Sequence, residues 1–125
     1  MNDRKLESYK RVDLSTKVLN ANAQQLIQML YDGAIERLAV AKGALSRDDM
    51  PVKGLMIGKA ISIISGLRNA LDMEVDSELP TTLDQLYEYM QFRLLEANSK
   101  NDGAMIDEVL ELIKVVKSGW DELAV

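Results

Sequence analysis

The chain has 125 residues and a formal net charge of −5 at pH 7, and it contains neither cysteine nor histidine. Its 47% hydrophobic and 28% charged residues are typical of a folded globular domain, and its length predicts a single domain, residues 1–125. The acidic balance without a basic cluster argues against nucleic-acid binding, and no apolar run reaches the ~20 residues of a membrane span, so we expect no membrane insertion. The N-terminus does not resemble a secretory signal and cysteine is absent, so we expect a cytoplasmic protein.

The first 21 residues are apolar at intervals too irregular for a long helix. We expect a short helical turn and an extended arm, which together form an N-terminal cap over the rest of the chain. Tyr9 and Val12 are its candidate contact residues, because an aromatic side chain outside any long helix must dock somewhere or remain exposed.

Four segments with apolar residues every three or four positions predict helices over about 22–46, 51–75, 80–98 and 104–123. Asn22 is a candidate N-cap of the first helix, Pro51 suits the first turn of the second, and Asn101 or Asp102 is expected to cap the last. Short connections make successive helices antiparallel. The predicted fold is therefore all-α, an up-down-up-down four-helix bundle with a short N-terminal cap.

The second predicted helix is apolar around about half of its circumference, whereas a bundle helix needs an apolar face only a little over 100° wide. We assign Ala60, Ile63 and Leu67 to the core. The surplus predicts a surface for a partner, although the same side chains could also pack against neighbouring helices or the arm. The candidate surplus residues are Ile57, Ile61 and Ile64 on the second helix, Phe92 and Leu95 on the third, and Leu112 and Val115 on the fourth.

Catalytic and metal-binding patterns are missing from the sequence. Without histidine and cysteine the chain lacks the usual general base and the common zinc and haem ligands. The carboxylates of residues 72–78 lack the glycine and glutamate that a calcium loop requires. Gly54 and Gly58, followed by Lys59, do not have the spacing of a phosphate loop and indicate a close approach of two helices. We therefore expect no catalytic residue, no cofactor and no metal.

Residues 28–35 (QMLYDGAI) resemble a segment of the flagellar secretion chaperone FliS family. Residues 59–64 (KAISII), 86–90 (LYEYM) and 107–109 (DEV), with Trp120 near the end, agree with that family in the same order. The resemblance implies a four-helix bundle that binds the disordered C-terminal segment of flagellin. It also implies that the protein prevents premature polymerisation and delivers flagellin to the flagellar type III export apparatus.

The apolar surplus and the resemblance lead to one hypothesis for the site. Helices of flagellin lie in apolar grooves on the second and fourth helices, and the arm covers a groove in the free protein. The export gate and an anti-sigma factor are further candidate partners. Two alternatives remain at this stage: a regulatory adapter that sequesters another helical protein, and a structural module that homodimerises. The residues assigned to partner binding are Ile57, Ile61, Ile64, Leu112, Val115, Tyr9 and Val12.

Overall fold

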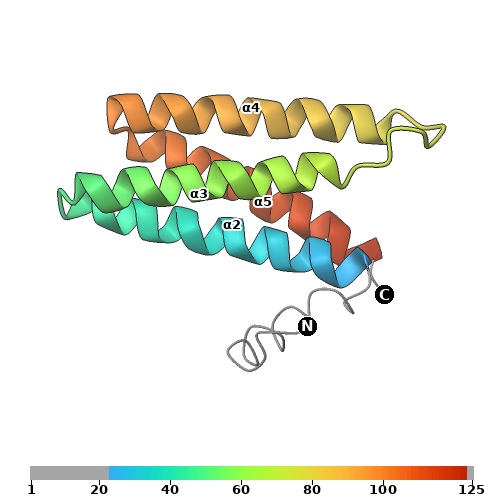
Figure 1. Cartoon of the computed structure of the whole chain (residues 1–125), viewed down its shortest axis with the longest axis horizontal. Helices are drawn as coiled ribbons and strands as arrows, with labels where there is room; N and C mark the ends of the chain where they lie inside the picture. The colour runs from blue at the N-terminus through green and yellow to red at the C-terminus, as the bar shows by residue number, and fades with distance from the viewer. Residues whose placement is uncertain (1–22, 124–125) are drawn as a thin grey trace, which may run out of the picture.

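The structure, a computed structural model, describes residues 23–123, and Tyr9, Val12 and Asn22 lie outside that part of the chain. Its helices are α2 (Ala23–Ser46), α3 (Met50–Asn69), α4 (Leu79–Lys100) and α5 (Gly103–Leu123). Helix α2 packs against α3 and α5, and α4 packs against the same two helices. Helix α5 crosses obliquely, from beside the end of α4 to beside the start of α2 (Figure 1). The predicted all-α four-helix bundle is confirmed, and no strand occurs within residues 23–123.

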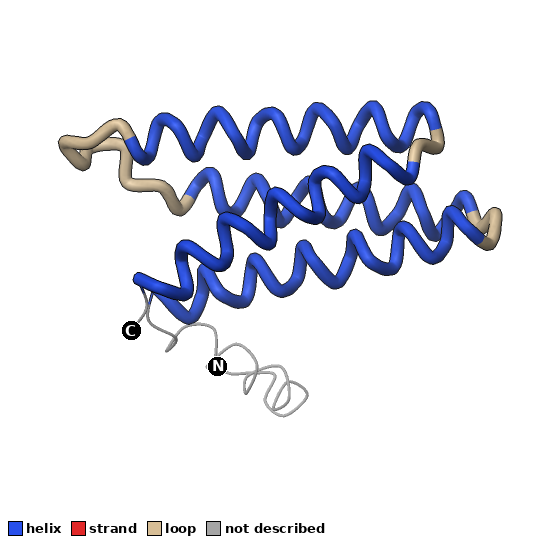
Figure 2. Tube along the Cα trace, turned by 180° about the vertical axis from the view of Figure 1, so that it is seen from behind, coloured by secondary structure: helices blue, strands red, loops and turns tan. Residues whose placement is uncertain are grey.

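Side-chain caps fix the starts of two helices. The carboxylate of Asp49 accepts a hydrogen bond from the backbone N–H of Val52 at 3.3 Å, and a proline stands in the first turn of α3 as predicted. Asp102 accepts from the N–H groups of Ala104 and Met105 at 2.9 and 3.3 Å, so Asp102 is the cap of α5. Asn101 instead closes α4 in the left-handed region at φ 52°. These caps explain the two short connections at one end of the bundle (Figure 2).

Helix α3 ends at Asn69, about two turns before the predicted end near residue 75. The N–H of Ala70 still bonds to the carbonyl of Gly66 at 3.1 Å, and turns follow. The prediction was wrong because carboxylates at 72, 74, 76 and 78 oppose a helix C-terminus, whose dipole is negative. Asp and Ser in this segment also favour turns through local hydrogen bonds. The connection of residues 70–78 forms the opposite end of the bundle (Figure 2).

The core lies between all four helices. Near its centre the hydroxyls of Tyr31 and Tyr87 share a 2.6 Å hydrogen bond between α2 and α4, which stand at opposite corners of the bundle. Burial raises the pKa of both phenols, so the pair stays neutral and each hydroxyl has a partner. The largest fully buried side chains are Tyr87, Leu38, Ile57, Ile64, Leu67, Met90, Leu94, Ile106, Ile113 and Val109.

The buried face of α3 differs from the expected one. Ile57 and Ile64 are 1% and 0% exposed and lie in the core, so their expected position on the outer edge was wrong. Ile63 lies instead against α2, where its Cδ1 would be 3.3 Å from a Cβ added at Gly33. The buried face takes Ala60 and Leu67 from the residues assigned to the core and Ile57 and Ile64 from the adjacent surplus, so the wide apolar sector alone did not fix where the core face begins and ends. The buried residues of α3 are Lys53, Ile57, Ala60, Ile64 and Leu67.

By length and composition alone, α3 could also cross a membrane, with a mean hydropathy of 1.3 over its most apolar window. The core helix of a soluble bundle meets the same criterion. In this structure α3 packs against both α2 and α4, and it carries Lys53, Lys59 and Arg68. Packing in the bundle therefore accounts for part of its apolar character, since 28% of that window is buried.

Candidate functional site

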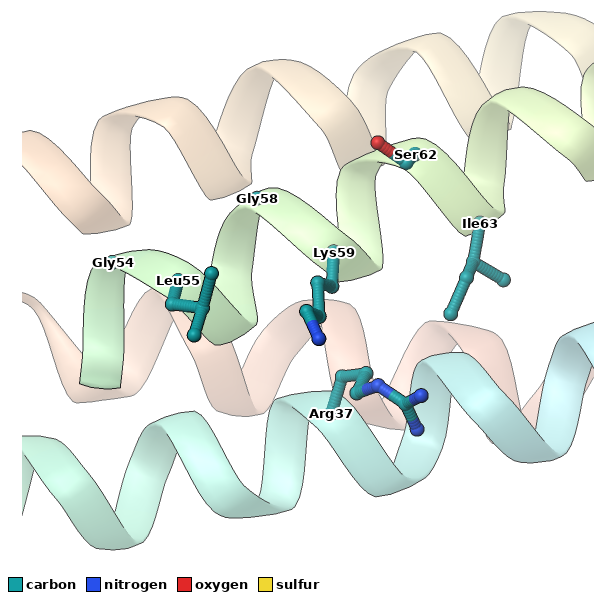
Figure 3. Close-up of a pocket in the computed structure, with 7 residues that line it drawn as sticks. All are labelled: Arg37, Gly54, Leu55, Gly58, Lys59, Ser62 and Ile63. Carbon is teal, nitrogen blue, oxygen red and sulfur yellow. The ribbon is translucent and has the colours of Figure 1, made fainter. Parts of the chain in front are cut away.

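The outer face of α3 carries a groove of about 490 Å³. Seven residues line it, six of them from α3 and one from α2: Arg37, Gly54, Leu55, Gly58, Lys59, Ser62 and Ile63. Lys59 and Ile63 point toward α2, while Ser62 points away from it (Figure 3). We call this surface the α3 groove. Its volume falls within the range of ligand-binding sites. Its lining is mostly apolar and includes two cationic side chains, those of Arg37 and Lys59.

Glycine gives the α3 groove its depth. No heavy atom lies within 4 Å of the position that a Cβ would take at Gly58, so the missing side chain leaves open space. At Gly54 the nearest such atom is Oδ1 of Asn98, at 3.7 Å, an ordinary contact. The expected close approach of two helices was therefore wrong at Gly58, and at Gly54 the neighbouring helix is only in ordinary contact. The backbone of α3 is accessible to a partner at Gly58.

Helix α3 has no acidic residue, and its three cations have different surroundings. Nζ of Lys53 is buried and donates to the backbone oxygen and Oδ1 of Asn98, at 2.9 and 2.7 Å. Arg68 forms a two-pronged pair with Asp84, at 2.7 and 3.1 Å, and this hydrogen-bonded guanidinium lowers the pKa of Asp84. Lys59 is exposed in the groove and has no hydrogen-bond or ion-pair partner among residues 23–123. Lys59 is therefore the available cation of this helix.

The side of α3 that faces α4 is fixed by a glutamine. Gln91 donates to the carbonyl of Ile61 at 3.0 Å and to the hydroxyl of Ser65 at 2.8 Å, and it accepts from Arg68 at 3.1 Å. With the Lys53–Asn98 bonds, this contact sets the antiparallel register of α3 and α4. The same register places Leu95 of α4 level with residues 57–58 of α3.

Exposed apolar side chains occur on several helices. Leu55 on α3 is 55% exposed, and Phe92 and Leu95 on α4 are 65% and 58% exposed, which confirms that the last two point away from the core. Val115 on α5 is 68% exposed. Large side chains at this exposure are the usual material of a docking surface when they gather together.

The predicted site residues do not form one cluster. Ile61 is half-buried on the side of α3 that faces α4, and Leu112 is half-buried on α5. Val115 also lies on α5, which stands across the bundle from α3. The structure therefore does not bring the two predicted groups together, and the partner-binding role of each residue stays a prediction. The described residues 23–123 contain no cluster of three metal-ligating side chains.

Comparison with known proteins decides the family. The family model described as "Flagellar protein FliS" matches residues 5–125. The chain belongs to the FliS family. It is 51% identical over 119 residues to the flagellar secretion chaperone FliSB of Pseudomonas aeruginosa, an alignment that covers 95% of this chain and 94% of that protein.

Other members of the FliS family are similar over the same extent. The flagellar secretion chaperone FliS of Vibrio cholerae is 42% identical over 118 residues, covering 94% of this chain and 87% of that protein. FliS of Salmonella typhimurium is 39% identical over 120 residues, covering 95% and 89%. The likeness therefore extends over nearly the full chain rather than one motif. The family's named role is that of a secretion chaperone, which is not an enzymatic role.

Sequence reasoning missed the cationic part of the site. The sequence patterns brought Lys59 up only beside the glycines of an incomplete phosphate loop and in the family-like segment 59–64, and they did not assign Arg37 to a site. The available signal was that residues 50–69 contain lysine and arginine but no aspartate or glutamate, within a chain of net charge −5. Such a local reversal of charge marks a surface where a carboxylate would be favoured.

Proposed function

We propose that this protein is a cytoplasmic export chaperone that binds the C-terminal segment of flagellin on its helical surface. Binding prevents that segment from polymerising early and presents flagellin to the flagellar type III export apparatus. The observation that carries this proposal is the 51% identity, over nearly the whole chain, to a protein named flagellar secretion chaperone.

The energetics require several apolar anchors at once. Covering one large apolar side chain contributes roughly 1.5–3 kcal/mol, whereas ordering a disordered segment costs roughly 2–5 kcal/mol or more. One exposed residue would therefore not hold a disordered ligand. Leu55, Phe92, Leu95 and Val115 supply exposed apolar area on three helices, which is consistent with a ligand that extends across the bundle.

Individual contact residues are part of the proposal. Ile61, Leu112 and Val115 are accessible in part or in full and contact flagellin directly. Ile57 and Ile64 are buried, so they support the helix that carries the contact surface from beneath. Tyr9 and Val12 cover part of the same surface in the free chain, and they lie outside the described residues.

Flagellin binding is tested by titrating the full chain with a peptide of the flagellin C-terminal segment in a calorimeter. Wild type should bind with a negative heat-capacity change, because apolar surface is buried. Val115→Asp should weaken binding and should leave the unfolding midpoint nearly unchanged, because residue 115 is exposed. Lack of binding by the folded wild-type chain would remove flagellin as the partner.

The N-terminal cap is tested by deleting residues 1–13. The shortened chain should bind more of a fluorescent dye that reports exposed apolar surface, and its affinity for the peptide should rise because the covering segment no longer competes. A shortened chain with the dye binding and affinity of wild type would contradict the cap.

A further inference from the structure

We infer that the α3 groove holds one helix of the bound flagellin segment, and that this helix carries a carboxylate which pairs with Lys59 and Arg37. The inference rests on the proposed function, since flagellin is the occupant. It adds the place where one ligand helix lies and the charge by which that place selects it. Two features argue for it: the shape of the groove and its local charge.

The shape of the groove fits a helix. The lining residues of α3 run from Gly54 to Ile63, which is about 14 Å along a helix axis, or more than two turns. Leu55 and Ile63 offer apolar contact near the two ends of this stretch. Between them Gly58 presents bare backbone, with no heavy atom within 4 Å of an added Cβ. A second helix can approach closely there, and its own side chains fill the space.

The charge of the groove selects an acidic side chain. None of the seven lining residues is acidic, and α3 as a whole has no carboxylate, in a chain of net charge −5. Within residues 23–123, Arg37 bonds only to its sequence neighbour Glu36, an exposed pair at 3.1 Å, and Lys59 has no hydrogen-bond or ion-pair partner. Exposed ion pairs of this kind are weak and easily exchanged. A ligand carboxylate at Lys59 therefore gains an attraction that it would lack beside the acidic connection of residues 70–78.

Gly58 offers a substitution that fills the groove without disturbing the bundle. Gly58→Leu places a side chain in open space and replaces glycine in a helix interior, so the fold is not weakened. Ala39→Leu on α2 is the control, since it also adds bulk at an exposed helix position and does not line the groove. In calorimetric titration with the flagellin peptide, Gly58→Leu should reduce affinity about tenfold or more, and Ala39→Leu should bind as wild type does.

The role of the Lys59 charge is tested by a double-mutant cycle, in which one change is made at Lys59 and the other at the acidic residues of the peptide. Lys59→Glu should weaken binding of the natural peptide at least about fivefold, and Lys42→Glu, an exposed reversal on α2 outside the groove, serves as its control. With a peptide whose Asp and Glu are replaced by Asn and Gln, wild type and Lys59→Glu should differ much less. Raising the salt from 0.05 to 0.5 M should weaken wild type more than Lys59→Gln, because exposed pairs are screened.

Three outcomes distinguish failure of flagellin binding, failure of the α3 groove as its site, and occupation of the groove by a second copy of the chain. If the folded wild type does not bind the peptide, flagellin binding itself fails. If wild type binds and both Gly58→Leu and Lys59→Glu bind equally well, flagellin binding stands and the α3 groove is not its site. If the free wild-type chain sediments as a dimer that Lys59→Glu dissociates, the groove is occupied by a second copy, and the inference is overturned.

Discussion

The two faces of α3 are both apolar, but they are built from different residues. The inner face consists of large side chains with almost no exposed area, Ile57, Ile64 and Leu67, with Ala60 between them. The outer face consists of Leu55, Gly58, Lys59 and Ser62, which leave a groove. The large side chains of the inner face fill the core, whereas the residues of the outer face leave a groove at the surface. A helix with a wide apolar sector therefore need not be buried over all of it, and the size of its side chains distinguishes the two faces.

The inner face should be the more sensitive of the two to loss of volume. Ile64→Ala removes buried methyl and methylene groups from a fully enclosed site, so it should lower the free energy of unfolding by about 2–5 kcal/mol. Chemical denaturation followed by circular dichroism measures this effect. Ser62→Ala, on the outer face, is the control and should stay within about 0.5 kcal/mol of wild type. Similar losses in the two variants would show that the faces do not differ in packing.

Lys53 is the polar exception on the inner face. Its ammonium group bonds to the backbone oxygen of Asn98, close to the C-terminus of α4, where the helix dipole favours a positive charge. Lys53→Met keeps most of the chain length and removes the donor, so two oxygens of Asn98 lose a partner. The expected loss is about 1–3 kcal/mol of unfolding free energy in the same denaturation experiment. A more stable variant would mean that burying the charge costs more than its hydrogen bonds return.

The positions of the faces were only partly predictable from sequence. In α4 the outward positions of Phe92 and Leu95 were predicted correctly, because one apolar stripe, of Tyr87, Met90, Leu94 and Ala97, fixes the phase of the helix. In α3 isoleucines occur on several sides, and tertiary contacts decide the phase. Lys53 reaches Asn98 and Ile63 packs at Gly33, and neither partner is visible in the local pattern.

The candidate site was less predictable than the fold, for a related reason. A groove is a relation between residues on different helices, and Arg37 comes from α2 while Lys59 comes from α3. The apolar surplus predicts a partner surface on α3, and that role stays a prediction. It pointed to Ile57 and Ile64, whereas the open positions are those of Leu55 and Gly58. The hydrophobic pattern of the sequence singled out α3. Which side of α3 is open could be read only from its packing in the bundle.

The ion pair at the edge of the outer face should make stability depend on acid. The pKa of Asp84 is lowered by Arg68, so the folded state holds this carboxylate ionised below its usual pKa of 3.8. The stabilisation is therefore present above about pH 3.8 and is lost as pH falls through the lower pKa of the folded state. Urea unfolding should be measured from pH 7 to pH 3 for wild type and Asp84→Asn. The gap between their free energies of unfolding should become smaller toward pH 3. Glu108, whose pKa is lowered by Tyr89 and Arg93, remains in both proteins and cancels in the gap. A gap that stays constant with pH would contradict the ion pair.

The smallest effect should come from the open position itself. Gly58→Ala adds a methyl group where no atom is within 4 Å, so it gains helix propensity without a clash and should stabilise the chain by about 0.5–1 kcal/mol. Gly33→Ala is the opposite case on α2, because its methyl group would lie 3.3 Å from Cδ1 of Ile63 and the gain in propensity is offset by crowding. Thermal unfolding should therefore raise the midpoint for Gly58→Ala by a few degrees and leave that for Gly33→Ala lower. If the two alanines acted alike, space at Gly58 would not distinguish the outer face from the packed one. If they differ, a stabilising methyl group is available at a position that the chain keeps empty, as expected where a partner helix must approach.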